Sequence, residues 1–199
     1  MKKDLKHILI ETMFEALYFE GYNASNLNTL LKKAGTSKGG LYHHFGSKKE
    51  LALETLSVVV GDFLDLYWKP ALESNNHPVD AIEELLKKLP GTRILGHAVY
   101  DFKYGCPLNN MIQEMSAIDD DFNALLSRLF TRWATIVKES FDRAVEKGVF
   151  KKDMDTLKIS EFFVASLEGC LSMAKVRRSE ETYLSSTSTL LEYLRTYEA

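Results

Sequence analysis

The stretch that decides the fold reads GTSKGGLYHHFGSKKE and spans residues 35–50. Gly35 follows an apolar-periodic run and stands where the end of a helix favours a residue that tolerates left-handed backbone angles. Ser37 can cap a new short helix through its hydroxyl, and Ser47 with Glu50 three positions later has the spacing of a second capping box. Two helices joined by a short glycine-containing turn are typical of a helix-turn-helix.

The outer face of this unit is rich in hydrogen-bond donors and carries no acid. No Asp or Glu occurs between Glu20 and Glu50, and acids facing a duplex would repel its phosphates. The alternative is an ordinary helical hairpin on a protein surface, which needs no such density of donors. The pattern therefore favours contact with double-stranded DNA. The donors are Thr36, Ser37, Lys38, Tyr42, His43, His44 and Lys48.

The composition is that of an ordinary globular protein, with 199 residues that are 45% hydrophobic and 27% charged. The net charge is −3 overall, but it is +3 over residues 1–50 and −6 over the remainder. A mildly basic front on an acidic body fits a small DNA-binding unit carried by a larger one, although so small an excess is also compatible with plain solvated surface. The two cysteines, Cys106 and Cys170, are too few for a disulfide framework, which predicts reduced and buried thiols.

Several classes of protein are disfavoured by what the sequence lacks. No apolar run approaches the roughly 20 residues that span a bilayer, and the polar start MKKDLKH is not a secretory leader, so we expect a cytoplasmic protein without a membrane partner. The spacings Glu-x-x-His, His-Glu-x-x-His and Cys-x-x-Cys do not occur, and neither does a glycine-rich phosphate loop ending in Lys-Ser/Thr. We expect no catalytic residues, no metal site and no cofactor.

Helical periodicity runs through almost the whole chain, so the predicted fold class is all-α with about nine helices. A first helix ends at Gly21, a second ends at Gly35, and the short third follows Ser37. A fourth runs from about Lys48 to Leu72 and is apolar on nearly every face, which predicts burial on all sides and a bridge without a flexible linker. The predicted domains are residues 1–47 and 48–199. Later helices begin at Pro78 and Pro107, extend from Asp119–Asp121 to Lys147, and cover Thr156–Arg177 and Glu180–Tyr197.

Residues 21–51 resemble the DNA-binding signature of the TetR family of bacterial transcriptional regulators, from GYNASNL through to LYHHFGSKKEL. The resemblance implies a regulator, most often a repressor, that binds a palindromic operator in double-stranded DNA under the control of a small-molecule effector. The sequence departs from the common pattern at Gly46, where a basic residue is frequent, and at His43, where an aromatic is frequent. By position, the residues expected to contact DNA are Ser25 or Asn26, Thr36, Ser37, Lys38, Gly39, Tyr42, His43 and Lys48.

The last two helices are where proteins of this family pair with a second copy, so the resemblance implies a homodimer. Ser166, Gly169 and Ser172 are small enough to allow a close approach of the partner, and twofold symmetry is the commonest form of oligomer. The alternative is that both apolar stripes face only the core of their own protein.

The resemblance also implies an effector site among the middle helices. Aromatic and methionine side chains line ligand cavities, although the same residues more often fill a core. Residues 104–111 and 166–171 resemble segments of one TetR subgroup, and Asn109, Asn110 and Gln113 either orient a polar ligand or cap and solvate their helix. The candidate ligand-binding residues are Tyr100, Phe102, Tyr104, Met111, Met115, Trp133, Phe163 and Met173.

A second hypothesis is a helical sensor or interaction module that keeps the helix-turn-helix without using it on DNA. The nearly even charge balance permits this interpretation. A gel shift against the upstream region of the chain's own gene separates the two hypotheses.

Overall fold

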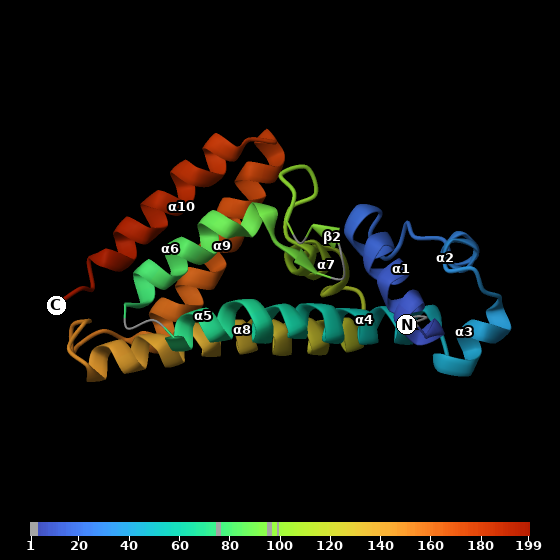
Figure 1. The fold of residues 1–199 in the computed structure, drawn as a ribbon, viewed down its shortest axis with the longest axis horizontal. Helices are drawn as coiled ribbons and strands as arrows, with labels where there is room; N and C mark the ends of the chain where they lie inside the picture. Colours follow the sequence, from blue (N-terminus) through green and yellow to red (C-terminus); the bar gives the residue numbers. More distant parts are fainter. Residues whose placement is uncertain (1–3, 75–76, 95–96, 99) are drawn as a thin grey trace.

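Three short helices form one end of the molecule, and a larger helical body forms the other (Figure 1). The computed structural model describes residues 4–74, 77–94, 97–98 and 100–199. The short helices are α1 (Leu5–Phe19), α2 (Leu27–Lys33) and α3 (Lys38–His44), which we call the head. The C-terminus lies at the opposite end from α3, so the third helix of the head is the part of the fold farthest from the body's last helices.

The caps predicted from the sequence set the ends of the head helices. Asn26 Oδ1 accepts hydrogen bonds from two backbone N–H groups in the first turn of α2, and Ser37 Oγ accepts one from Gly40 N at the start of α3. Ser47 Oγ accepts from Glu50 N at 3.0 Å, while the Glu50 carboxylate accepts from Gly46 N at 2.7 Å. The helix-turn-helix geometry predicted for residues 35–50 is therefore confirmed.

A long rod joins the head to the body. It consists of α4 (Lys48–Phe63), a π-helical turn η1 (Leu64–Trp68) and α5 (Lys69–Ser74), which follow one another without a break. The predicted extent of the fourth helix is thus nearly correct, but its predicted burial on all sides is wrong, because 78% of Leu66 is exposed. The rod packs against α1, α6 and α8, and its Leu66 faces solvent.

The body contains the remaining helices. They are α6 (Pro78–Lys88), the short 3₁₀ turn η2 (Leu89–Gly91), α7 (Pro107–Met115), α8 (Asp120–Glu146), α9 (Thr156–Arg177) and α10 (Glu180–Arg195). Asp119 caps α8 by accepting from Asp121 N and Phe122 N, as the acidic run predicted. A two-residue antiparallel ladder, β1 (Arg93–Ile94) with β2 (His97–Ala98), is the one sheet in the described residues. If α4, η1 and α5 are counted as one helix and the short η2 turn is left out, the described chain has nine helices. The all-α prediction is confirmed.

The core is continuous from the head into the body. Met13 of α1, Leu41 of α3, Leu56 of α4, Phe122 of α8 and Phe163 of α9 belong to one buried cluster, and none of them is measurably exposed. Apolar burial of this kind is the main stabilising term in a fold of this size. The packing shows no gap at the predicted domain boundary between residues 47 and 48. This boundary marks the end of the helix-turn-helix, and it stays a prediction.

Candidate nucleic-acid interface and apolar pocket

The outer surface of α3 is open to solvent. Lys38, Gly39, Tyr42 and His43 are exposed, and Tyr42 leaves 55% of its surface uncovered although it is a large aromatic residue. The opposite side of α3 carries Leu41, which is fully buried and holds the helix in the head. In Figure 1 no other element covers α3 on its outer side. The polar side chains of α3 are thus free to enter a groove of DNA.

The two glycines of α3 have different structural roles. A Cβ on Gly40 would lie 2.2 Å from Thr36 Oγ1, so the fold itself requires glycine there. A Cβ on Gly39 would meet only Ser37 Oγ at 3.6 Å, an ordinary contact, so packing does not require glycine at this position. Thr36 is half-buried against this turn. Gly39 keeps the exposed surface of α3 low, which suits a close approach to a duplex.

Two expected DNA contacts are directed into the protein. Ser25 is only 5% exposed and its hydroxyl donates to Tyr22 O, so of the pair Ser25 and Asn26 only Asn26 faces solvent. The structure therefore favours Asn26 over Ser25 for this contact, which stays a prediction. The Lys48 ammonium donates to Tyr22 O and Ser25 O, each at 2.6 Å, and lies over the Tyr22 ring. One of its three N–H donors remains, and its contact with a phosphate stays a prediction.

Acidic side chains of the body bind the base of the head. Glu114 of α7 accepts hydrogen bonds from Tyr22 N at 2.9 Å and Asn23 N at 2.7 Å. Lys49 forms ion pairs of 2.7 Å with both Asp119 and Asp121 at the start of α8. These hydrogen bonds and charges lower the pKa of Asp119 and raise the pKa of Lys49. The head is therefore held against α7 by Glu114, and the start of the rod is held against α8 by Lys49.

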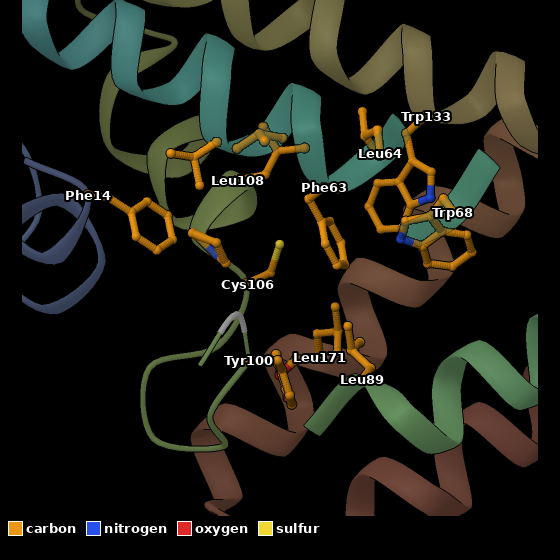
Figure 2. Close-up of a pocket in the computed structure, with 13 residues that line it drawn as sticks. Phe14, Phe63, Leu64, Trp68, Leu89, Tyr100, Cys106, Leu108, Trp133 and Leu171 are labelled. Carbon is orange, nitrogen blue, oxygen red and sulfur yellow. The ribbon is translucent and has the colours of Figure 1, made fainter. Parts of the chain in front are cut away.

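An apolar pocket lies between the head, the rod and the body (Figure 2). It offers about 40 Å³ to the centre of a water-sized sphere, whereas one water needs roughly 10–15 Å³ by this measure. Phe14 of α1 forms one wall, the rod forms a second, and Leu108 of α7, Trp133 of α8 and Leu171 of α9 complete it. No charged side chain of the described residues lines it. Such a space suits a small, mainly apolar molecule.

Only two of the eight candidate ligand-binding residues line this pocket, namely Tyr100 and Trp133. Phe163 is core, packed edge-on against Trp68 with ring centroids 6.2 Å apart, and Phe102 packs on Tyr100 and Tyr183. Met115 is buried beneath the head, where Asn23 Nδ2 approaches its sulfur. These three residues do not line the pocket because they pack in or against the core around it, and their predicted ligand contacts stay predictions.

The other three candidates lie in the loop before α7 (Tyr104), on the buried side of α7 (Met111) and on the exposed side of α9 (Met173). Tyr104 and Met111 border a shallow surface groove between the end of α1 and α7, and Met173 is 45% exposed on α9. They do not line the apolar pocket, and their predicted ligand contacts stay predictions.

The polar residues of α7 bind neighbouring elements. Asn109 Nδ2 donates to Ser172 Oγ at 3.0 Å, and Asn110 donates to Tyr104 O while accepting from Lys175 Nζ at 2.7 Å. Gln113 is exposed. The two asparagines therefore attach α7 to α9 and to the preceding loop, a role that neither alternative from the sequence described.

The sequence did not single out the residues that the rod contributes to the pocket. Periodicity could not separate these positions from their neighbours, because the rod is apolar on several faces. The π-helical turn places both Leu64 and Trp68 in the wall, and π turns inside α-helices are frequent at functional sites. The residues that the rod contributes are Val59, Val60, Phe63, Leu64 and Trp68.

Glu168 is a buried carboxylate behind the pocket wall. It is 5% exposed, and neither of its oxygens has a hydrogen-bond partner in the described chain. Burial raises its pKa to about 7, and the neighbouring Cys106 thiol offsets part of this rise. Cys106 itself lines the pocket, and burial raises the pKa of its thiol well above the usual value, so the thiol stays protonated. Both cysteines are free, as predicted.

An exposed helix-turn-helix on a helical body with an apolar pocket defines a class of DNA-binding regulators of transcription. The comparisons with known proteins agree. The family model described as bacterial regulatory proteins, tetR family, matches residues 9–55, and the model described as Tetracyclin repressor-like, C-terminal domain, matches residues 85–190. The chain belongs to the TetR family. Because this family is made up of transcriptional regulators, the prediction that the chain is not an enzyme is confirmed.

Named relatives cover most of the chain. The transcriptional regulator AcuR of Cereibacter sphaeroides is 28% identical over 91% of this chain and 81% of its own length. The HTH-type transcriptional repressor DhaR of Mycobacterium sp. (strain GP1) is 22% identical over 87% of this chain and 83% of its own. These similarities extend through the body and are not limited to the helix-turn-helix.

Solved structures share the whole architecture. The regulatory protein TetR from Rhodobacter sphaeroides superposes with a TM-score of 0.81 at 26% identity, over 95% of this chain and 98% of that one. A cysteine mutant of the TetR-family regulator CifR, determined with a 26-bp double-strand operator DNA, gives a TM-score of 0.77 at 19% identity, over 96% of this chain and 97% of that one. At so low an identity, the second likeness shows the fold alone.

No helix among the described residues combines the length and the apolar character needed to cross a membrane. Within the same residues, no three side chains of His, Cys, Asp or Glu come together as a set that could hold a metal ion.

Proposed function

We propose that this TetR-family regulator is a homodimeric repressor of a palindromic operator. A small molecule bound in the apolar pocket changes its affinity for that operator. The observation that carries the proposal is the composition of the pocket wall. Phe14 of α1 and Trp68 of the rod both line it. Helix α1 packs against α3, and the rod begins at Lys48, shortly after α3 ends at His44. A molecule that fills the pocket therefore acts directly on the support of the DNA-contacting helix. Relatives described as a repressor and as an operator complex support the rest.

The coupling follows a short physical route. The rod begins at Lys48, immediately after the Ser47 cap that ends the helix-turn-helix, and reaches the pocket at Val59. Glu114 of α7 holds the head at Tyr22, and Asp119 and Asp121 hold the start of the rod through Lys49. A ligand that favours one position of the rod shifts the population between two placements of the head, in proportion to its difference in affinity for them.

The proposed dimer surface is a stripe on the outer face of α9. Phe162, Ser166, Gly169, Met173 and Val176 follow one another at intervals of four and three residues, and Val176 is 83% exposed. This spacing is typical of a helix that packs against another helix, and Gly169 has open space where a Cβ would stand. On α10, Leu184 and Tyr193 are also exposed large apolar residues. A contiguous apolar surface of this kind is unusual on a monomer.

One of the three small residues expected at this surface is not there. Ser172 is half-buried and accepts a hydrogen bond from Asn109, so it faces α7 and not a partner. The stripe is one helical position away, on Gly169 and Met173. The dimer proposal therefore rests on Ser166 and Gly169 and no longer on Ser172.

Replacing Tyr42 with alanine is expected to weaken operator binding by roughly tenfold to a hundredfold, the usual range for one good base or phosphate-and-base contact. Tyr42 is exposed on α3, so its removal leaves the core untouched. A gel shift with the upstream region of the gene measures the change, and Leu66→Ala, an exposed large residue on the rod, is the control. Unchanged binding by the Tyr42 variant would show that another face meets the DNA.

Lys48→Met and Lys38→Met form a pair that separates support of the head from contact with phosphate. Lys48 donates to two backbone oxygens of the head, so we expect its loss to lower the free energy of unfolding by about 2 kcal/mol. Exposed Lys38 should cost almost nothing in stability. Both variants should reduce the slope of binding against salt by about one phosphate. A normal slope for Lys48→Met, measured by fluorescence anisotropy over a salt series, removes Lys48 from the DNA contacts.

The decisive experiment on function is a gel shift with the native upstream region, repeated on scrambled DNA of equal length. Specific retardation at nanomolar protein supports the regulator on a defined operator. Equal binding to both fragments at all salt concentrations favours the second candidate, a sensor module whose helix-turn-helix does not read DNA. A regulator of this kind works where the chromosome lies, and we propose the cytoplasm as its location.

A further inference from the structure

Two hydrogen-bond donors beside the pocket have no acceptor among the described residues, and their nitrogens lie behind the apolar surface that their rings present to it. Trp68 and Trp133 are 1% and 4% exposed, and the Nε1–H group of each is buried without a hydrogen-bond partner among the described residues. Both side chains line the cavity. Figure 2 shows their nitrogens where the two rings approach each other, and the ring centroids are 5.0 Å apart. Buried polar groups are normally paired, so two unpaired donors in one cavity wall call for an explanation.

Neighbouring rings do not supply an ordinary partner. The two indoles meet edge to face, and Trp68 also meets the edge or face of Phe163. A ring face is a weak acceptor compared with an oxygen atom. The remaining polar groups of the wall are no better, because the Tyr100 hydroxyl donates to Leu171 O and the Cys106 thiol is protonated. An oxygen acceptor that enters the cavity therefore gains hydrogen bonds that the protein does not make for itself.

The lining excludes most other ligand chemistry. No ammonium, guanidinium or carboxylate group of the described residues borders the cavity. An anion would lose its hydration without a cation to replace it, and a cation would face donors instead of acceptors. The available space admits a compact molecule of a few non-hydrogen atoms. A neutral carbonyl compound with a short apolar body meets all of these conditions.

We propose that the pocket binds a small neutral molecule whose carbonyl-type oxygen accepts hydrogen bonds from the indole N–H groups of Trp68 and Trp133. This inference rests on the proposed function in that it assigns the chemistry of the effector in the same pocket. The apolar body of the ligand lies against Phe14, Phe63 and Leu108. The two indoles then recognise the oxygen and the rest of the wall recognises shape.

The test compares cyclopentanone with methylenecyclopentane, which has the same shape but a CH₂ group in place of the oxygen. The sequence contains two tryptophans, and both line the pocket, so intrinsic fluorescence reports on this site alone. Trp68→Phe and Trp133→Phe each remove one N–H and leave the other indole as the reporter. We expect each to weaken cyclopentanone binding by roughly fivefold to tenfold and to change methylenecyclopentane binding by less than about twofold.

Phe63→Leu is the matched control, since it alters the wall without removing a donor and should affect both ligands alike. The indole N–H signals of tryptophan-labelled protein give a second measurement that needs no variant. They should move downfield with cyclopentanone and stay in place with methylenecyclopentane. Equal losses for both ligands in the tryptophan variants, unmoved N–H signals, or no binding of cyclopentanone overturn the proposal.

A gel shift in the same mixtures tests the proposed function separately. In one outcome, cyclopentanone binds in a tryptophan-dependent way while operator binding stays unchanged. That result supports the indole contact and contradicts a regulatory role for the pocket. Altered operator binding that persists in both tryptophan variants keeps regulation by a ligand but contradicts the indole contact.

Discussion

Replacing Gly169 with glutamate is expected to produce a folded monomer that binds operator DNA roughly a hundredfold more weakly, because two linked heads gain this much over one. Gly169 lies in the middle of the exposed stripe on α9, and no atom of the chain stands within 4 Å of a Cβ built there. The substitution therefore meets nothing in its own subunit. In a dimer it would bury an unpaired charge on each side of the twofold axis, which costs several kcal/mol.

The choice of glycine makes the result easy to interpret. Glutamate has a higher helix propensity than glycine, by roughly 0.5–1 kcal/mol, so the variant should fold at least as well as the parent. Ala124→Glu, on an exposed position of α8, adds the same charge away from the stripe and serves as control. Light scattering coupled to gel filtration gives the mass, and a gel shift gives the affinity. A Gly169→Glu protein that remains a dimer places the interface elsewhere.

Replacing Glu168 with glutamine should stabilise the protein by about 3 kcal/mol at pH 8 and change little at pH 5. Burial raises the pKa of Glu168 from 4.5 to about 7. Between these values the folded protein holds a proton that the unfolded chain has released, so raising the pH favours unfolding. The free energy of unfolding therefore falls through this window and becomes level above about pH 7. Glutamine has no charge to bury and removes this loss.

Urea unfolding at pH 5 and pH 8, at one protein concentration, measures the effect through the midpoint at constant slope. Glu161→Gln is the control, since Glu161 is exposed on the same helix. The expected pattern is a smaller loss of stability with pH in Glu168→Gln than in the parent or the control. If all three lose stability equally between the two pH values, Glu168 is not the group that responds.

Local features of the fold were predictable from the sequence, because they depend on neighbouring residues. Ser37, Ser47 and Asp119 cap their helices as predicted, and the ends of α9 agree with the prediction. A cap needs only a side-chain oxygen and the next three backbone N–H groups. The same reasoning found the donor-rich exposed face of α3, since exposure of Lys38 and Tyr42 follows from which face carries Leu41.

Features that depend on packing between distant segments were not predictable. Ser25 has the chemistry of a DNA contact, but the fold turns its hydroxyl onto Tyr22 O. Met173 and Trp68 are both apolar residues on helices, yet one is 45% exposed and the other lines the pocket. The π-helical turn that contains Trp68 has no periodic signature in the sequence. The residues that form the wall of the apolar pocket could be identified only from the assembled helices.

The unbroken rod also has a mechanical consequence. Between Trp68 in the pocket and Lys48 under the recognition helix, the chain rises by roughly 30 Å at 1.5 Å per residue. A stiff lever of that length multiplies small angles, so a pivot of about 5° at the pocket sweeps its far tip through roughly 2.5 Å. A twofold axis would apply the same displacement to the second head. The distance between the two α3 helices would then change by about twice this amount, enough to disturb their fit into successive major grooves.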